Sequence, residues 1–300
     1  MCCTGSSSLP GSVAVMLADA LPFLACPLCS AELTMDDAAL RCPHSHTFDV
    51  ARQGYVNLLS GKASGSPGDT AAMVAARAQF LAAGHFGPIV RAVAAAAQRA
   101  LVDRPAGCVV DIGAGIGHYL ASVLDAVPGR VGLALDVSKF ALRRAAKAHA
   151  RLGAIGCDAW QGLPVRTGSA ALALSIFAPR NPAEIHRILG PNGTLIVVSP
   201  TTRHLIELVW QLDLLKIEPE KQERIEAAMT PYLQLSSEDD WEFTMSLSHG
   251  DIVSAVGMGP SSWHTNAAVL HDRVRALDEP MAVTASVIVS SYRRRAKEDR

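Results

Sequence analysis

Short apolar runs, separated by polar and glycine-containing segments, recur along the last two thirds of the chain. Five of these runs are predicted as strands, at 108–110, 131–135, 154–157, 170–177 and 193–199. Helical stretches separate them, and two later strands at 241–247 and 282–290 have the pattern of an antiparallel pair. This alternation of strand and helix predicts an α/β fold with a Rossmann-like sheet of seven strands.

Two helices are predicted ahead of this sheet. Apolar residues recur with helical period from Thr70 to Ala83, with Asp69 placed as the N-cap and Gly84 placed to end the helix. A second helix is predicted from about 88 to 101. The stretch 60–68 is rich in Gly, Ser and Pro, which indicates a flexible connection between two domains.

Three cysteines and a histidine near the N-terminus have the spacing of a structural metal site. Cys26, Cys29, Cys42 and His46 form the pattern Cys-x2-Cys-x12-Cys-x3-His, in which each close pair presents two ligands from one tight turn. This donor set predicts Zn²⁺. His44 is an alternative fourth ligand, because Cys42-x-His44 is also geometrically possible.

The remaining cysteines, Cys2, Cys3, Cys108 and Cys157, are too irregularly spaced for a disulfide framework, which predicts a reducing, cytoplasmic compartment. No Lys or Arg precedes Arg41, so a secretory signal is not expected, and no apolar run is long enough to span a bilayer. With 300 residues and 49% hydrophobic content, the chain supports one large core and one small module. We expect a leader at 1–24, a zinc-binding domain at 25–60, a linker with helices at 61–104 and a larger α/β domain at 105–300.

A glycine-rich loop follows the first strand of the larger domain. The run Asp111-Ile-Gly113-Ala-Gly115-Ile-Gly117 allows a sharp turn and close approach of a ligand to the backbone, with a helix N-terminus behind it. Its glycine spacing differs from that of dinucleotide-binding enzymes, and Asp111 is placed to meet an amino acid group. The pattern therefore favours S-adenosylmethionine over NAD.

Two more acids follow predicted strands. Asp136 ends the second strand, where a carboxylate can accept both ribose hydroxyls, although it could instead cap the next helix. Asp158 follows the third strand and could contact the adenine amino group or remain a solvated loop acid. The stretch 176–182 follows the fourth strand and is expected to border the methyl acceptor, unless it only stiffens a loop before the next helix.

Several longer strings are more specific than these fold signals. They are TFDVARQGYVNLL at 47–59, MVAAR at 73–77, AGHF at 83–86, FAPRN at 177–181 and MGPSSWH at 258–264. With the zinc pattern, they resemble the RlmA-type 23S rRNA (guanine-N1)-methyltransferases, and most closely the tylosin-resistance branch of actinomycetes. The resemblance covers nearly the whole chain. It implies an S-adenosylmethionine-dependent methyltransferase domain and a zinc domain that helps to hold 23S rRNA.

The resemblance also implies residue roles. Phe86, Tyr119, Leu120 and His204 correspond to cofactor contacts, and the substrate is N1 of a hairpin guanosine near the peptide exit tunnel. A homodimer and a role in macrolide response follow from the same similarity. This chain departs from the family at Ala114 and Ile116, which bears on fine cofactor contacts.

The chemistry requires little covalent participation by the protein. The acceptor nitrogen must be placed in line with an activated methyl group, and the target guanine must be unpaired. Its N1 proton must also leave, to water or to a protein group. Asp69 and Arg180 are the candidate catalytic residues.

A formal net charge of −1 is unusual for an enzyme that binds RNA. Segment 213–242 carries nine acids and three bases, a charge of −6, which leaves +5 on the rest of the chain. Four bases recur every four residues on one predicted helix: Lys139, Arg143, Lys147 and Arg151. They could form a solvated helix face or contact phosphates. Bases near the zinc module are predicted RNA contacts: Arg41, Arg52, Lys62 and Arg77.

Two other functions remain open at this stage. One is a methyltransferase for a small metabolite, in which zinc only braces the fold. The other is a non-catalytic zinc-containing RNA-binding factor, which the complete loop at 111–117 and Asp136 disfavour.

Overall fold

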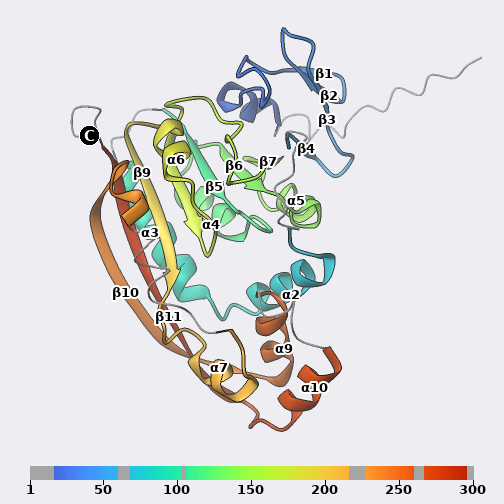
Figure 1. The fold of residues 1–300 in the computed structure, drawn as a ribbon, viewed down its shortest axis with the longest axis vertical. Helices are drawn as coiled ribbons and strands as arrows, with labels where there is room; N and C mark the ends of the chain where they lie inside the picture. Colours follow the sequence, from blue (N-terminus) through green and yellow to red (C-terminus); the bar gives the residue numbers. More distant parts are fainter. Residues whose placement is uncertain (1–16, 60–67, 103–105, 216–226, 260–266, 296–300) are drawn as a thin grey trace, which may run out of the picture.

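An eight-stranded mixed sheet runs through the centre of the molecule in the order β10-β11-β9-β8-β5-β6-β7-β4 (Figure 1). The computed structural model describes residues 17–59, 68–102, 106–215, 227–259 and 267–295. All pairs from β4 to β9 are parallel, and β11 pairs antiparallel with both β9 and β10. The strands are β4 (Tyr55–Asn57), β5 (Cys108–Ile112), β6 (Gly132–Asp136), β7 (Leu152–Gly156), β8 (Ala170–Ile176), β9 (Leu189–Pro200), β10 (Leu233–Leu247) and β11 (Met281–Arg294).

All seven predicted strands are present, and the fold class is confirmed. The last two strands are longer than predicted: β10 begins at Leu233 and not at 241, and β11 ends at Arg294 and not at 290. Glu238, Asp239 and Asp240 lie on this exposed edge strand, where their charges hide the strand pattern in the sequence. Charged side chains on an edge strand also hinder pairing with other chains.

The eighth strand comes from the segment assigned to the zinc module. Tyr55, Val56 and Asn57 pair in parallel with Ala154, Ile155 and Gly156 of β7. The expected boundary at residue 60 therefore does not separate the two sheets, because β4 belongs to the larger one. Three residues are too few to show a strand period, so this pairing was not visible in the sequence.

The described end of the expected leader also belongs to the core. Leu17, Ala20 and Leu24 are fully buried, and Leu24 forms an isolated bridge with Val165. A short 3₁₀ helix, η1 (Leu21–Phe23), lies between Ala20 and Leu24. Residues 17–24 thus pack against the sheet, whereas residues 1–16 lie outside the described part of the chain.

Side chains of the central strands alternate between two apolar clusters. Val109 packs with helices α3 and α4 in one cluster, and Val110 packs with the N-terminal segment and Ile185 of α6 in the other. This alternation follows from the two-residue period of a strand. The described helices are α2 (Ala71–Ala82), α3 (Gly87–Leu101), α4 (His118–Ala126), α5 (Lys139–Ala145), α6 (Pro182–Ile188), α7 (Ile206–Leu212), α9 (His249–Gly257) and α10 (Ala267–Arg275).

The two helices ahead of the sheet lie where they were predicted, but the cap differs. Thr70, and not Asp69, is the N-cap of α2, and its side chain accepts a hydrogen bond from Met73 N at 3.2 Å. Gly84 follows the helix with φ of +81°, as expected for a residue that ends it. Of the predicted connection at 60–68, residues 60–67 lie outside the described part of the chain.

The predicted basic helix is shorter than its charge pattern suggested. Helix α5 ends at Ala145, so Lys147 and Arg151 lie beyond it. Arg151 donates hydrogen bonds to the carbonyls of Val127 and Arg130 at 3.1 and 2.8 Å. The prediction of a four-residue basic stripe along one helix is therefore wrong. Arg151 lies beyond the helix and donates hydrogen bonds to backbone carbonyls.

The N-terminal module contains its own antiparallel sheet of β1 (Thr34–Asp36), β2 (Ala39–Arg41) and β3 (Thr47–Asp49). Across the described residues, no single helix is long and apolar enough to cross a membrane. Helices α2 and α3 meet the length and composition required for a span only when they are taken together, and they are bent by 85° relative to each other.

Candidate cofactor and metal sites

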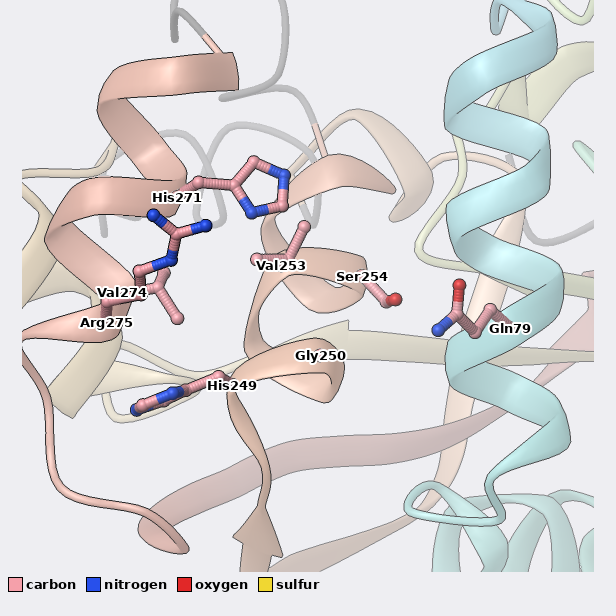
Figure 2. A pocket seen from close by; sticks show the side chains of 8 residues that line it. All are labelled: Gln79, His249, Gly250, Val253, Ser254, His271, Val274 and Arg275. Atoms are coloured by element: carbon pink, nitrogen blue, oxygen red, sulfur yellow. The ribbon is translucent and has the colours of Figure 1, made fainter.

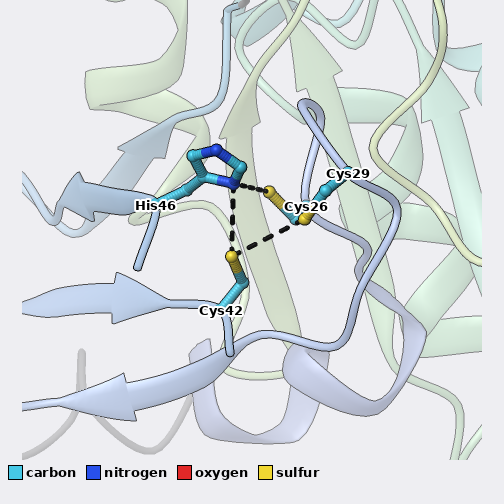
Figure 3. A group of neighbouring side chains, drawn as sticks. All are labelled: Cys26, Cys29, Cys42 and His46. Carbon is cyan, nitrogen blue, oxygen red and sulfur yellow. Dashed lines mark hydrogen bonds between the residues drawn. The ribbon is translucent and has the colours of Figure 1, made fainter. Parts of the chain in front are cut away.

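The four predicted zinc ligands converge in the N-terminal module (Figure 3). Nδ1 of His46 lies 3.3 Å from Cys42 Sγ and 3.5 Å from Cys26 Sγ, and the sulfurs of Cys29 and Cys42 are 3.7 Å apart. Tetrahedral bonds of about 2.3 Å to sulfur and 2.0 Å to nitrogen separate two sulfurs by about 3.8 Å and a sulfur from a nitrogen by about 3.5 Å. The cluster thus fits Zn²⁺.

Two tight turns present these ligands. Ser30 and Ser45 both have a positive φ, and their amides donate to the carbonyls of Cys26 and Cys42 at 2.8 and 3.0 Å. His44 is exposed and is not part of the cluster. Of the two histidines, His46 is therefore the one that lies within reach of the three sulfurs, and its role as the fourth ligand stays a prediction.

The glycine loop lies between β5 and α4. Gly113, Gly115 and Gly117 all have a positive φ, which glycine adopts without strain. A Cβ atom on Gly113 would lie 2.6 Å from the Cβ of Ala178, in the loop after β8. The missing side chain therefore allows the two loops to meet.

Asp136 holds this loop from the end of β6. Its carboxylate accepts hydrogen bonds from the amides of Gly115 and Ser138, both at 2.8 Å. The N-cap of α5 is Ser138, so the alternative role of Asp136 as a helix cap is wrong. Its predicted contact with ribose hydroxyls stays a prediction.

Asp111 of β5 and Tyr119 of α4 flank the glycine loop in the sequence. Burial raises the pKa of Asp111 to about 8, and the nearby carboxylate of Asp136 adds to this rise. Burial and Asp111 also raise the pKa of Tyr119. Among the described residues, the Tyr119 hydroxyl is buried and has no hydrogen-bond partner. The α-amino acid end of S-adenosylmethionine carries a cation and polar atoms that would satisfy both groups, so the residues present fit this cofactor.

An aromatic cluster of three rings lies beside the loop after β8. The ring centroids of Phe86, Phe177 and His204 lie 5.7–6.0 Å apart. Phe86 is buried, whereas Phe177 is 40% exposed and has φ of +52°. The family resemblance pointed to Phe86 and His204. Phe177 was not singled out, although its position within the predicted acceptor stretch 176–182 was a signal for it.

His204 is an uncharged member of this cluster. Burial lowers the pKa of its imidazole to about 4. Its Nδ1 accepts a hydrogen bond from Ser286 N at 3.2 Å, which leaves the proton of the neutral ring on Nε2. The ring therefore offers one N–H donor and an apolar face at neutral pH.

The other predicted site residues have contacts of their own. Leu120 is fully buried in the core, so only its backbone could reach a cofactor. Asp158 is buried at the end of β7 and accepts a hydrogen bond from Trp160 N at 3.0 Å, which excludes a solvated loop acid. Arg180 donates to Ser199 Oγ at 2.8 Å.

Asp69 and Arg77 form an ion pair beside the glycine loop. Nη2 of Arg77 also donates to the carbonyl of Met258 at 2.8 Å. The predicted role of Arg77 as an RNA contact does not match this position, because its guanidinium is turned inward and its side chain is only 25% exposed. The predicted RNA contact Lys62 lies outside the described residues.

A cavity of about 380 Å³ lies apart from these groups, between α2, α9 and α10 (Figure 2). Gln79 and Ser254 face each other on one side of it, and His271 and Arg275 project from α10 on the other. No residue of the glycine loop or of the aromatic cluster lines this cavity.

Comparison with known proteins identifies the family of the chain. A zinc-ribbon profile described as RlmA, N-terminal, matches residues 24–65. A protein of Micromonospora griseorubida described as a 23S rRNA (guanine-N1)-methyltransferase is 50% identical over 291 residues, covering 92% of this chain and 98% of the relative. The chain belongs to the family of 23S rRNA (guanine-N1)-methyltransferases.

The 23S rRNA (guanine(748)-N(1))-methyltransferase of Streptomyces fradiae is 47% identical to this enzyme over 265 residues, covering 88% of this chain and 94% of the relative. Among solved structures, the YcgJ protein of Bacillus subtilis matches 69% of this chain and 99% of its own, with a TM-score of 0.47 and 16% identity. So distant a similarity says nothing about the substrate. The family resemblance noted from the sequence is confirmed by the two actinomycete relatives.

The zinc site predicts a difference between two neighbouring histidines. His46→Ala removes one of four ligands, so the purified protein is expected to lose its stoichiometric zinc and to unfold in this module at lower temperature. His44→Ala is the matched control and retains the metal. Zinc content by plasma emission spectroscopy decides between them. Loss of zinc in His44→Ala alone would contradict the assignment.

Asp111 predicts a pH-dependent stability. Its pKa is 3.8 ordinarily and about 8 in the folded protein, so between these values the folded state retains a proton that the unfolded chain releases. The free energy of unfolding must then fall as pH rises from about 4 to 8. Asp111→Asn removes this loss, and its stability relative to wild type should rise across that window while affinity for S-adenosylhomocysteine falls.

Urea unfolding at pH 5, 6, 7 and 8 measures this effect. Asp272→Asn, at an acid whose side chain is 78% exposed, is the matched control and should follow the wild-type profile. Identical pH slopes for Asp111→Asn and wild type would mean that Asp111 is ionised in the folded state.

Proposed function

We propose that this enzyme transfers the methyl group of S-adenosylmethionine to N1 of a hairpin guanosine in 23S rRNA, at the position equivalent to guanine 748 in the name of the Streptomyces fradiae relative. Similarity over nearly the whole length of that relative carries the proposal. The convergence of Asp111, the glycine loop and the aromatic cluster at one sheet edge supports it.

The residues of the site divide the work of binding. Asp111 and Tyr119 receive the amino acid end of the cofactor, and Asp136 receives its ribose. Asp158, which is buried just after the adjacent strand β7, contacts the adenine in this proposal. When bound, S-adenosylmethionine supplies a methyl group that is already activated by its sulfonium, so the protein need only place the acceptor and exclude water.

The loop Phe177–Asn181 forms the acceptor side. Gly113 brings it against the glycine loop, and Ser175 Oγ donates to the carbonyl of Ala178 at 3.4 Å. The left-handed backbone at Phe177 turns an aromatic ring outward at the end of a buried strand, and such strain is often kept where function requires it. A guanine extruded from its hairpin would stack on this ring.

The proton of guanine N1 leaves to solvent in this proposal. Asp69 is held by Arg77, and Arg180 is a cation that donates to Ser199, so neither of the predicted catalytic residues is poised as a free base. Transfer of the proton to water balances the reaction once the methyl group has moved.

Substrate RNA would also contact the zinc module. Arg52 is exposed there, and Arg41 is exposed while it pairs with Asp36 at 2.9 Å. Both lie on the module whose strand β4 joins the sheet beside β7. Action in the cytoplasm, a homodimer and protection against tylosin-type macrolides remain part of the proposal.

The deciding experiment is transfer of radiolabelled methyl from S-adenosylmethionine to unmodified large-subunit rRNA. We expect incorporation at one guanosine, mapped as a stop of reverse transcription because N1-methylguanine cannot pair. Incorporation into small aromatic acceptors without rRNA would indicate a metabolite methyltransferase. Binding of rRNA without any transfer would indicate a non-catalytic factor.

Phe177 predicts a separation of RNA use from cofactor binding. Phe177→Leu removes the aromatic face, so kcat/KM for rRNA should fall roughly 5- to 150-fold, the loss expected for one base–aromatic stack of about 1–3 kcal/mol. The Kd of S-adenosylhomocysteine should stay within about twofold of wild type, a bound below half a kcal/mol.

Trp241→Leu is the matched control for this variant. Trp241 is 38% exposed, a fraction similar to the 40% of Phe177, but Trp241 lies on β10 at the far edge of the sheet. Its rRNA kinetics should resemble wild type. Equal losses in both variants, or a selective loss of cofactor affinity in Phe177→Leu, would remove Phe177 from the acceptor site.

A further inference from the structure

Arg77 of α2 lies against the cofactor loop although nothing so far assigns it a ligand. Its Cδ and Nη1 atoms lie 3.7 Å from the position that a Cβ on Gly115 would occupy. The same Gly115 donates its amide to Asp136. The guanidinium of Arg77 therefore lies beside the glycine turn at Gly115. It is not on an outer surface near the zinc module.

The charges around this turn are unbalanced. Asp69, Asp111 and Asp136 are acids, and the carboxylates of Asp69 and Asp111 raise the pKa of Asp136 and Tyr119, respectively. Arg77 is the cation that opposes both effects among the described residues. His204 is neutral because burial lowers its pKa to about 4.

The amino acid end of S-adenosylmethionine presents both charges. Its ammonium has acids to meet in Asp111 and its surroundings, whereas its carboxylate needs a cation or several N–H donors. A guanidinium suits a carboxylate because its planar fork can donate two parallel hydrogen bonds. Resting on the S-adenosylmethionine dependence of the proposed function, we propose that Arg77 binds the methionine carboxylate of the cofactor.

Asp69 acts as a positioning residue in this arrangement. It pairs with Nη1 of Arg77, while Nη2 donates to the carbonyl of Met258, which caps the C-terminus of α9. Ser138 Oγ in turn donates to the carbonyl of Asp69 at 2.6 Å, so the segment before α2 is tied to the end of β6. These contacts aim the guanidinium toward the glycine loop before the cofactor arrives.

A purely structural role for Arg77 is the competing explanation. The hydrogen bond to Met258 joins α2 to α9, and its loss alone would loosen that contact. Such loosening would weaken every ligand of the site in the same proportion. A carboxylate contact would instead weaken only ligands that carry the carboxylate.

Isothermal titration calorimetry with two ligands tests the proposal without RNA. S-adenosylhomocysteine carries the carboxylate, and S-adenosyl-3-thiopropylamine has the same adenosine, sulfur and amine but lacks it. Arg77→Gln should weaken binding of the first about 10- to 100-fold, as expected for a lost charge-assisted hydrogen bond, and binding of the second less than about twofold. Arg77→Lys, which keeps the charge without the fork, should fall between Arg77→Gln and wild type for the first ligand.

Arg99→Gln is the matched control. Arg99 on α3 also pairs with an acid, Asp239 at 3.6 Å, but its side chain is 64% exposed. It should bind both ligands as wild type does. Thermal unfolding of each variant, with and without ligand, shows that the folded protein is being compared.

Equal weakening of both ligands by Arg77→Gln, or no weakening of either, would overturn the proposal. The result is separable from the proposed function. Wild-type protein that binds S-adenosylhomocysteine but does not methylate rRNA would remove the proposed substrate and leave the assignment of Arg77 intact.

Discussion

The close approach of two loops at the carboxyl edge of the sheet determines the rest of this site. Parallel neighbours β5, β6 and β8 all end at this edge, which brings the glycine loop, Asp136 and the segment after β8 together. Gly113 permits the approach because any Cβ there would collide with Ala178. The outward ring of Phe177 is placed by the same contact. A larger residue at position 113 would push the glycine loop away from the loop after β8.

Buried charge shapes how this edge can bind a ligand. Asp111 lies where water cannot stabilise its carboxylate, so burial raises its pKa and an approaching cation would favour its ionised form. Arg77 is held near the same turn by Asp69 and Met258. A ligand with a zwitterionic end complements both groups. If the proposals for Asp111 and Arg77 hold, one buried acid and one partly exposed base provide the charges that bind the two ends of this group.

The zinc module is attached more closely than a flexible tether would allow. Its own three-stranded sheet is small, and the metal-binding cluster adds to the apolar contacts of Leu33, Leu40 and Val50, which are buried in a cluster shared with the main sheet. Strand β4 then continues from this module into the main sheet. The exposed bases of the module, Arg41 and Arg52, are thus held in a defined position relative to β7.

Local pattern alone was sufficient for the central strands, the glycine loop and the three cysteines of the zinc pattern. Each of these features depends on residues close in sequence, such as the paired cysteines on tight turns or the apolar run before Asp111. The choice of His46 over His44 required the fold, because it depends on which ring the turn at Ser45 directs toward the sulfurs. The same holds for Thr70, whose side chain and not that of Asp69 reaches the free amide of Met73.

Long-range contacts decided the remainder. The pairing of β4 with β7, the burial of Leu17 and Leu24, and the hydrogen bonds of Arg151 involve partners far away in sequence, which no local periodicity records. Arg77 shows the difference most clearly. Its charge and its proximity to the zinc module suggested RNA in the sequence, whereas the tertiary structure turns it inward between Asp69, Met258 and Gly115, because the packing of α2 against α9 determines which way its side chain points.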